Sequence, residues 1–144
     1  MIAANRPQGS MALKYHPPTG SIVTVDFDHG FKPPEMVKRR LAVVISTPIK
    51  ERAGLCTIIP LSTSHPRKIM PYHYLLNIPF TLPKRWGNQP RWVKGDMIYS
   101  LGFHRIDLLS LGKDVNGKRR YQKSKINAAD LSAIKACVRA SLNL

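Results

Sequence analysis

A loop in the second half of the chain holds residues that could bind a nucleic acid. Residues 79–91 contain three prolines and several cations, with Trp86 among them. The cations of this loop are Lys84, Arg85 and Arg91. Single-stranded RNA is held by such groups, because bases stack on aromatic rings and phosphates pair with cations. Loops of this length are uncommon in a compact domain unless they bind something. A plain insertion is the alternative, and Trp86 and Trp92 could equally serve packing or a subunit contact.

Histidine and cysteine are the other residue types that could do chemistry. Five histidines are spread along the chain, and none shows metal-ligand spacing or an obvious partner. The histidines are His16, His29, His65, His73 and His104. Cys56 and Cys137 have no neighbouring cysteine, which argues against both a zinc site and a disulfide scaffold. We therefore expect reduced thiols, no metal and no cofactor.

The charge of the chain points to a polyanionic partner. Lysine and arginine total 23, aspartate and glutamate total 8, and the formal net charge is +15. Such a surface attracts nucleic acid, and an acidic protein could cover the same patch. No apolar run approaches the roughly 18 residues of a membrane span, and the start lacks the apolar stretch of a signal peptide. These features predict a cytoplasmic protein without a membrane partner.

The elements that must position these groups are mostly short strands. Alternating or continuous apolar runs predict strands at 21–27, 41–46, 55–61, 74–78, 97–101 and 106–109. Pro60 is expected to mark the end or the edge of the third strand, because proline has no backbone donor. Asn116-Gly117 is a strong hairpin-turn signal with basic flanks.

The end of the chain changes to helical spacing. Leu131, Ile134, Val138 and Leu142 recur on one face, and Asn127 is a suitable N-cap. Many short strands and one final helix predict a mainly β fold, a small antiparallel barrel with a C-terminal α-helix. Residues 16–144 are expected to form one domain, preceded by a disordered extension over residues 1–15.

Three blocks of the sequence together resemble the MazF/PemK family of toxin–antitoxin modules. The first is the strand GSIVTVDF at 20–27. The second is Glu35, followed five residues later by Arg40 and the strand LAVVIS. The third is IPLSTS at 59–64. Each block is weak alone, but their order and spacing are specific. The resemblance covers residues 16–144.

The resemblance implies an SH3-like barrel and a homodimer. It also implies a metal-free endoribonuclease that cuts single-stranded RNA and is neutralised by an acidic antitoxin. The expected products are a 2′,3′-cyclic phosphate and a 5′-OH end. By position, Arg40 matches the catalytic arginine, Ser62 the catalytic hydroxyl and Glu35 the supporting acid. Ser62 stands where the family usually has threonine, so Thr63 is the alternative hydroxyl.

Further residues are candidates for holding the RNA. They are Lys38, Arg39, Arg85, Trp86, Arg91 and His104. Two other functions stay open at this point. One is a non-catalytic barrel that binds nucleic acid. The other is a gyrase-targeting toxin, because the same fold also resembles toxins of that kind.

Overall fold

The computed structural model describes residues 13–144, so the extension predicted for residues 1–15 lies largely outside the described residues. The strands are β1 (Ile22–Phe27), β2 (Lys38–Val44), β3 (Leu55–Ser62), β4 (His73–Leu76), β5 (Arg91–Lys94), β6 (Tyr99–Gly102), β7 (Ile106–Leu108), β8 (Ser110–Lys113) and β9 (Arg119–Tyr121). The helix α1 spans Ala128–Leu142. The predicted class, mainly β with a C-terminal helix, is confirmed. Leu13 is buried in the core, so the packed part of the chain begins before residue 16.

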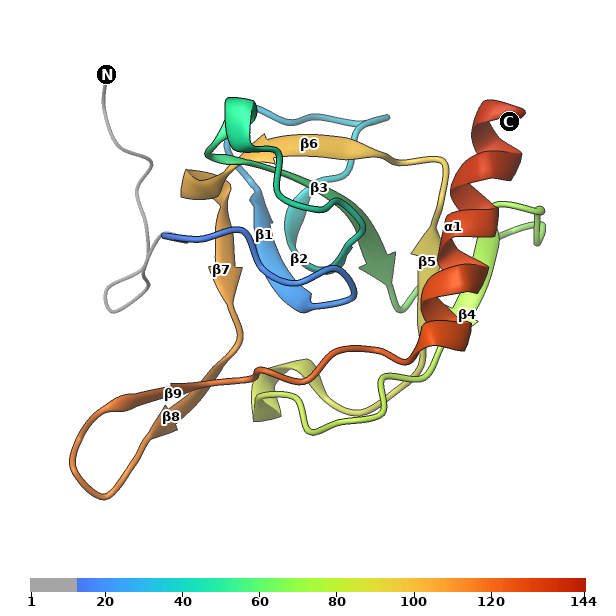
Figure 1. Ribbon diagram of the computed structural model, residues 1–144. Helices are drawn as coiled ribbons and strands as arrows, with labels where there is room; N and C mark the ends of the chain where they lie inside the picture. The colour runs from blue at the N-terminus through green and yellow to red at the C-terminus, as the bar shows by residue number, and fades with distance from the viewer. Residues whose placement is uncertain (1–12) are drawn as a thin grey trace.

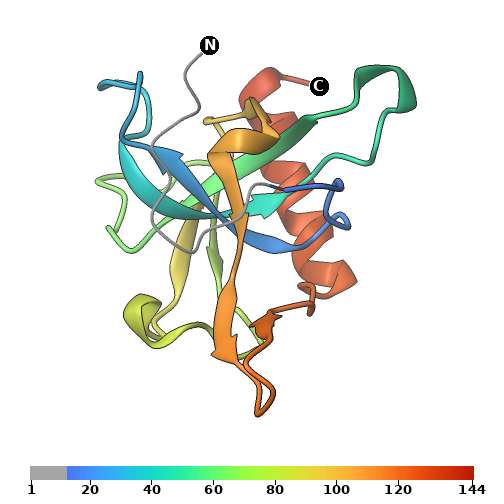
Figure 2. The same cartoon turned by 90° about the vertical axis from the view of Figure 1, so that its left-hand side faces the viewer.

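The strands form one strongly curved antiparallel sheet. Its order is β4-β5-β3-β2-β1-β7, and β6 pairs with the first half of β3. The β8–β9 hairpin extends away from this barrel, and α1 lies across the strands β4 and β5 (Figure 1). Figure 2 shows the hairpin below the barrel and α1 behind the sheet. The turn predicted at Asn116-Gly117 closes this hairpin, with Gly117 at a φ of 78°.

The central strands are buried on both faces because side chains alternate along them. On β2, Ala42 and Val44 belong to a core cluster with Phe27 and Ile58. Leu41 and Val43 point the other way, into a second cluster that includes Ile134 of α1. This explains why the sequence of β2 is a continuous apolar run rather than an alternating one.

Pro60 does not end the third strand but occupies an edge position within it, the second of the two predicted places. β3 continues to Ser62, and Pro60 lies opposite Ala42 of β2. On its other side, β3 pairs with β6 over residues 55–58 and with β5 over residues 61–62. Pro60 therefore falls in the gap between these two neighbours, where a missing N–H removes no ladder hydrogen bond.

The helix is capped and packed largely as predicted. The Asn127 side chain accepts a hydrogen bond from the Asp130 N–H at 2.8 Å, which confirms the N-cap. Ile134 and Cys137 are buried against the sheet, whereas Leu142 is 54% exposed and takes no part in the core. The helix approaches closely at Gly95, where a Cβ would lie 2.6 Å from the Cβ of Cys137.

A side-chain hydrogen bond joins α1 to β4, and its loss is expected to destabilise the fold. The Tyr74 hydroxyl donates to Asp130 Oδ1 at 2.6 Å. This bond, followed by burial, raises the pKa of Tyr74. Tyr74→Phe should lower the free energy of unfolding by about 1 kcal/mol at pH 7, because one partly exposed hydrogen bond to a carboxylate is lost.

The difference between the Tyr74→Phe variant and the wild type should depend on pH. A pKa raised on folding stabilises the fold below the unfolded-state pKa of tyrosine, and this stabilisation is lost as the pH rises through the folded-state value. The two proteins should therefore converge in alkaline solution when their unfolding is followed by urea titration. A constant difference up to alkaline pH would contradict this interpretation.

Candidate active site

Arg40 lies at the margin of the core cluster that contains Phe27 and Ile58. It shares a face of β2 with Ala42 and Val44 but is only half-buried. Its Nε donates to the carbonyl oxygen of Val37 at 2.9 Å. The other two guanidinium nitrogens have no hydrogen-bond partner among residues 13–144. The guanidinium is thus anchored at one nitrogen and keeps two nitrogens for an anionic ligand.

Strand register places Ser62 and Arg40 on the same face of the sheet. The β2–β3 pairing runs from Val44–Ile58 to Ala42–Pro60, and Arg40 and Ser62 each lie two residues beyond its last pair. Because side chains alternate along a strand, Arg40 shares the face of Ala42 and Ser62 shares the face of Pro60. Ser62 is 7% exposed, and its Oγ accepts from the Ser64 N–H at 3.1 Å, which leaves the hydroxyl proton free to be donated. Thr63 is exposed, one position further along the chain.

A row of side chains continues this face across two more strands. Ser62 pairs with Trp92 of β5, and Trp92 pairs with Leu75 of β4. Leu75 is 42% exposed, whereas Trp92 is largely covered. Two residues further along these strands, His73 pairs with Lys94, and this pair lies on the same face. The row therefore joins a cation, a hydroxyl and aromatic rings.

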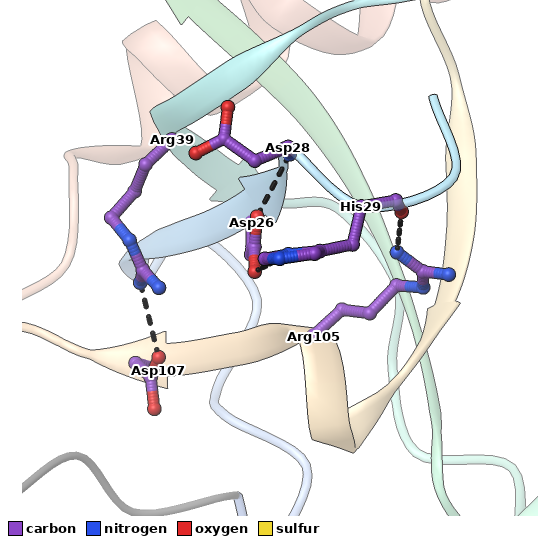
Figure 3. A network of polar contacts seen from close by, with 6 residues as sticks. All are labelled: Asp26, Asp28, His29, Arg39, Arg105 and Asp107. Carbon is purple, nitrogen blue, oxygen red and sulfur yellow. Dashed lines mark hydrogen bonds and ion pairs between the residues drawn. The ribbon is translucent and has the colours of Figure 1, made fainter. Parts of the chain in front are cut away.

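The three basic residues at the start of β2 differ in their surroundings. Lys38 is exposed and has a φ of 74°, so strand alternation does not assign it a face. Arg39 lies on the opposite face from Arg40, and its Nη1 is 3.3 Å from Asp107 Oδ2 (Figure 3). Of the two neighbours of Arg40 that were predicted to hold RNA, Lys38 is exposed and Arg39 is engaged in an ion pair.

Figure 3 shows further contacts that hold the loop after β1. His29 Nδ1 lies 2.9 Å from Asp26 Oδ2, and Arg105 donates to the His29 carbonyl oxygen at 2.8 Å. The Asp28 N–H donates to Asp26 Oδ1. The backbone bond from Asp28 and the contact with His29 lower the pKa of Asp26 against the raising effect of its burial, which is the largest single influence.

Glu35 makes no contact with Arg40. Its carboxylate accepts a long hydrogen bond of 3.4 Å from the Lys32 N–H, and the side chain is exposed. The group that orients Arg40 is the carbonyl of Val37 instead. A backbone carbonyl carries no residue-type signal, so sequence reasoning had no means of finding it.

Arg91 is buried and does not face solvent. It is 4% exposed, and its guanidinium donates to the carbonyl oxygens of Gln89 and Trp86. Burial lowers the pKa of Arg91. Its position on β5 puts it on the face of Val93, towards the second core cluster. Arg91 therefore clamps the loop predicted to bind RNA rather than contacting a ligand.

Arg85 and Trp86 lie on the other side of the sheet from Arg40. Trp86 packs against the second core cluster, and the exposed Arg85 guanidinium lies 4.9 Å from the Trp86 ring centroid. His104 is also remote. It follows Gly102, which pairs with Leu55 at the start of β3, whereas Ser62 ends that strand, about 20 Å further on. The structure does not bring these three residues to the Arg40 face.

The contrast between Arg91 and Arg85 gives a paired prediction. Arg91→Met should lower the free energy of unfolding by about 1.5–3 kcal/mol, because two backbone carbonyl oxygens lose a charged donor. Arg85→Ala should change stability by less than about 0.5 kcal/mol, because that guanidinium is exposed. Thermal unfolding of both variants measures the difference, and equal melting temperatures would contradict the clamp.

Sequence reasoning missed an aromatic cluster beside Ser62. The His65 and Trp92 ring centroids are 5.1 Å apart, those of His73 and Trp92 are 6.4 Å apart, and Tyr72 packs on His73. These residues come from three separate segments, so only strand register brings them together. Burial, followed by the charge of Lys94, lowers the pKa of His73, while Asp96 acts in the opposite direction.

Other chemistry has no comparable cluster in the described part of the chain. Among residues 13–144, no three His, Cys, Asp or Glu side chains are grouped to hold a metal ion. Cys56 and Cys137 are free and buried, and burial raises the pKa of the Cys56 thiol to about 11. No helix over these residues is long and apolar enough to cross a bilayer.

Sequence comparison connects the chain with known proteins. The sequence pattern of the PemK-like, MazF-like toxins of type II toxin–antitoxin systems matches residues 19–142. An uncharacterized protein of Haemophilus influenzae is 32% identical over 108 residues, which is 67% of this chain and 73% of that protein. The uncharacterized protein YifN of Escherichia coli K12 is 28% identical over 116 residues, covering 67% of this chain and 76% of YifN.

Solved structures share the fold at lower identity. The crystal structure of MazF from Deinococcus radiodurans has a TM-score of 0.59 and 21% identity, covering 90% of this chain and 99% of that one. An endoribonuclease from a mycobacterial species, solved in complex with its cognate antitoxin, has a TM-score of 0.57 and 16% identity. That match covers 89% of this chain and 96% of the endoribonuclease.

Proposed function

The chain belongs to the PemK-like, MazF-like toxins of type II toxin–antitoxin systems, and from this we propose that it is an endoribonuclease toxin acting on single-stranded RNA. The observation that supports the proposal is the register that puts Arg40 and Ser62 on one face of the sheet, each two residues beyond the last β2–β3 pair. A guanidinium and a hydroxyl side by side can bind two oxygens of one phosphate.

The proposed reaction uses the neighbouring 2′-hydroxyl of the RNA as its nucleophile. Attack on phosphorus gives a 2′,3′-cyclic phosphate and releases the 5′-oxygen, and no metal takes part in these steps. Arg40 stabilises the charge that develops on the phosphorane, and Ser62 donates a further hydrogen bond. Each such donor is worth about 3–4 kcal/mol in a sheltered site. The Val37 carbonyl holds the guanidinium in place, and Lys38 attracts the flanking phosphate.

Basic residues on the β8–β9 hairpin, away from Arg40, support binding to a polyanion. The β8–β9 hairpin carries Lys113, Lys118 and Arg120, which are exposed and have no carboxylate partner in the described region. Its acid, Asp114, is used to close the turn by accepting from two backbone N–H groups. Such a surface also suits an acidic antitoxin, and the solved relatives that are bound to an antitoxin favour this partner. We extend to this chain the homodimer that is usual in the family.

The proposal is tested with purified protein and a long single-stranded RNA in EDTA. Discrete fragments with 5′-OH and 2′,3′-cyclic phosphate ends are the expected products. Binding should weaken steeply with salt, because phosphate contacts release counterions. RNA that is bound but left intact would replace the proposal with a non-catalytic binder. Intact RNA together with stalled DNA supercoiling would replace it with a gyrase-targeting toxin.

A further inference from the structure

The proposed reaction lacks a group that accepts the 2′-hydroxyl proton. A guanidinium carries hydrogen-bond donors and no acceptor, so Arg40 cannot serve as an effective base. The Ser62 hydroxyl is not basic, and Glu35 makes no contact with Arg40. Of the residues on the Arg40 face, this leaves the imidazoles beside Trp92.

His65 packs against the cross-strand partner of Ser62. It follows β3 by three residues, is exposed, and its ring meets the Trp92 ring edge-on at 5.1 Å and 74°. Trp92 is itself the cross-strand partner of Ser62. The Trp92 ring therefore connects His65 with the strand pair that contains Ser62.

A hydrogen bond fixes which nitrogen of His65 is basic. Nδ1 is 2.7 Å from the carbonyl oxygen of Pro66, and a carbonyl can only accept, so Nδ1 carries the hydrogen. The neutral ring then has its lone pair on Nε2, which has no partner among residues 13–144. In His73 the two ring nitrogens have the opposite roles. Its Nδ1 accepts from the Met70 N–H at 3.0 Å, so its hydrogen is on Nε2 and the ring is a donor.

We propose that His65 is the general base of the cleavage reaction, which deepens the proposed function and rests on it. Nε2 takes the proton of the 2′-hydroxyl while Nδ1–H remains bonded to Pro66. The 2′-oxygen forms its bond to phosphorus, and the bond from phosphorus to the 5′-oxygen breaks. The 5′-oxygen leaves with the electron pair and takes a proton from water, and the imidazolium returns its proton to water.

Charged residues of the segment that carries His65 and of the strands β2, β4 and β5 bear on the pH dependence of this step. They are Arg40 on β2, His73 on β4, Lys94 on β5, Asp96 just after β5, and Arg67 and Lys68 in the segment that carries His65. Cations outnumber the single carboxylate among these residues, which favours attraction of a phosphate.

The test measures cleavage of a short RNA against pH for the wild type, His65→Gln, His65→Asn and Glu35→Gln. We expect the cleavage rate of both His65 variants to be about 100-fold or more below that of the wild type at pH 7. The acid limb of the pH profile, which is the decrease in rate towards acidic pH in the range where imidazoles titrate, should be absent from both variants. Asparagine keeps a donor for the Pro66 carbonyl, so its loss of activity would not reflect a disordered loop. Added imidazole should restore cleavage by the His65 variants but not by Arg40→Ala.

Three outcomes would overturn the inference. Wild-type rate and acid limb in both His65 variants would exclude a base at this position. Loss of the acid limb in Glu35→Gln alone would assign the base to Glu35. In both cases the wild type still cuts RNA, so the proposed function survives. Failure of the wild type to cut RNA would overturn the proposed function and this inference together.

Discussion

Arg40→Ala is expected to lower the cleavage rate by about 10²–10³-fold, which corresponds to the loss of one charged donor in a sheltered site. The loss should fall mainly on kcat, because the guanidinium meets its full negative charge only in the transition state. Arg40→Lys should recover a small part of the rate, since a lysine supplies a charge but not two parallel donors. Single-turnover cleavage of a short RNA measures both variants.

Arg39→Ala is the matched control for Arg40→Ala. It removes the same charge from the adjacent position, but the Arg39 side chain lies on the opposite face and pairs with Asp107. We expect it to reduce stability while retaining most of the catalytic rate per folded molecule. Equal losses of rate in the two variants would show that β2 contributes only general positive charge, and the active-site assignment would be wrong.

The fold was largely predictable because its signals are local. Alternation, β-branched runs and the Asn127 cap are each read from a few consecutive residues, and the structure agrees with them. For Pro60 the sequence left two positions open, the end of the strand or an edge, because its neighbours on one side of β3 are set by tertiary pairing. No local sequence pattern shows which residues of β3 pair with β6 and which pair with β5.

The site was less predictable because its residues meet through register. Arg40 and Ser62 were found from family spacing, whereas the pairing of Trp92 with Ser62 depends on strands thirty residues apart. Arg91 and Arg85 lie in the same basic loop of the sequence, yet Arg91 is buried and donates to carbonyl oxygens, whereas Arg85 is exposed. The sequence shows that a loop residue is basic, but not whether its side chain points into the core or towards solvent.

Phe27→Ala is expected to lower the free energy of unfolding by about 3–5 kcal/mol, the range for removing a buried aromatic side chain. Phe27 is fully buried, and its ring lies 5.1 Å from the rings of both Phe31 and Tyr99. Urea titration followed by tryptophan fluorescence measures the loss. Phe27→Leu keeps most of the apolar volume and should lose much less.

The same substitution should also disturb cleavage, because the Phe27 cluster holds the loop that orients Arg40. The Tyr99 hydroxyl accepts from the Met36 N–H at 2.9 Å, and the next residue, Val37, supplies the carbonyl that binds Arg40. An unsupported loop would let this carbonyl move and free the guanidinium. Phe27→Ala, assayed where it is still folded, should therefore cut RNA more slowly than Phe27→Leu. Equal rates per folded molecule would show that Arg40 is positioned by β2 alone, without help from the loop.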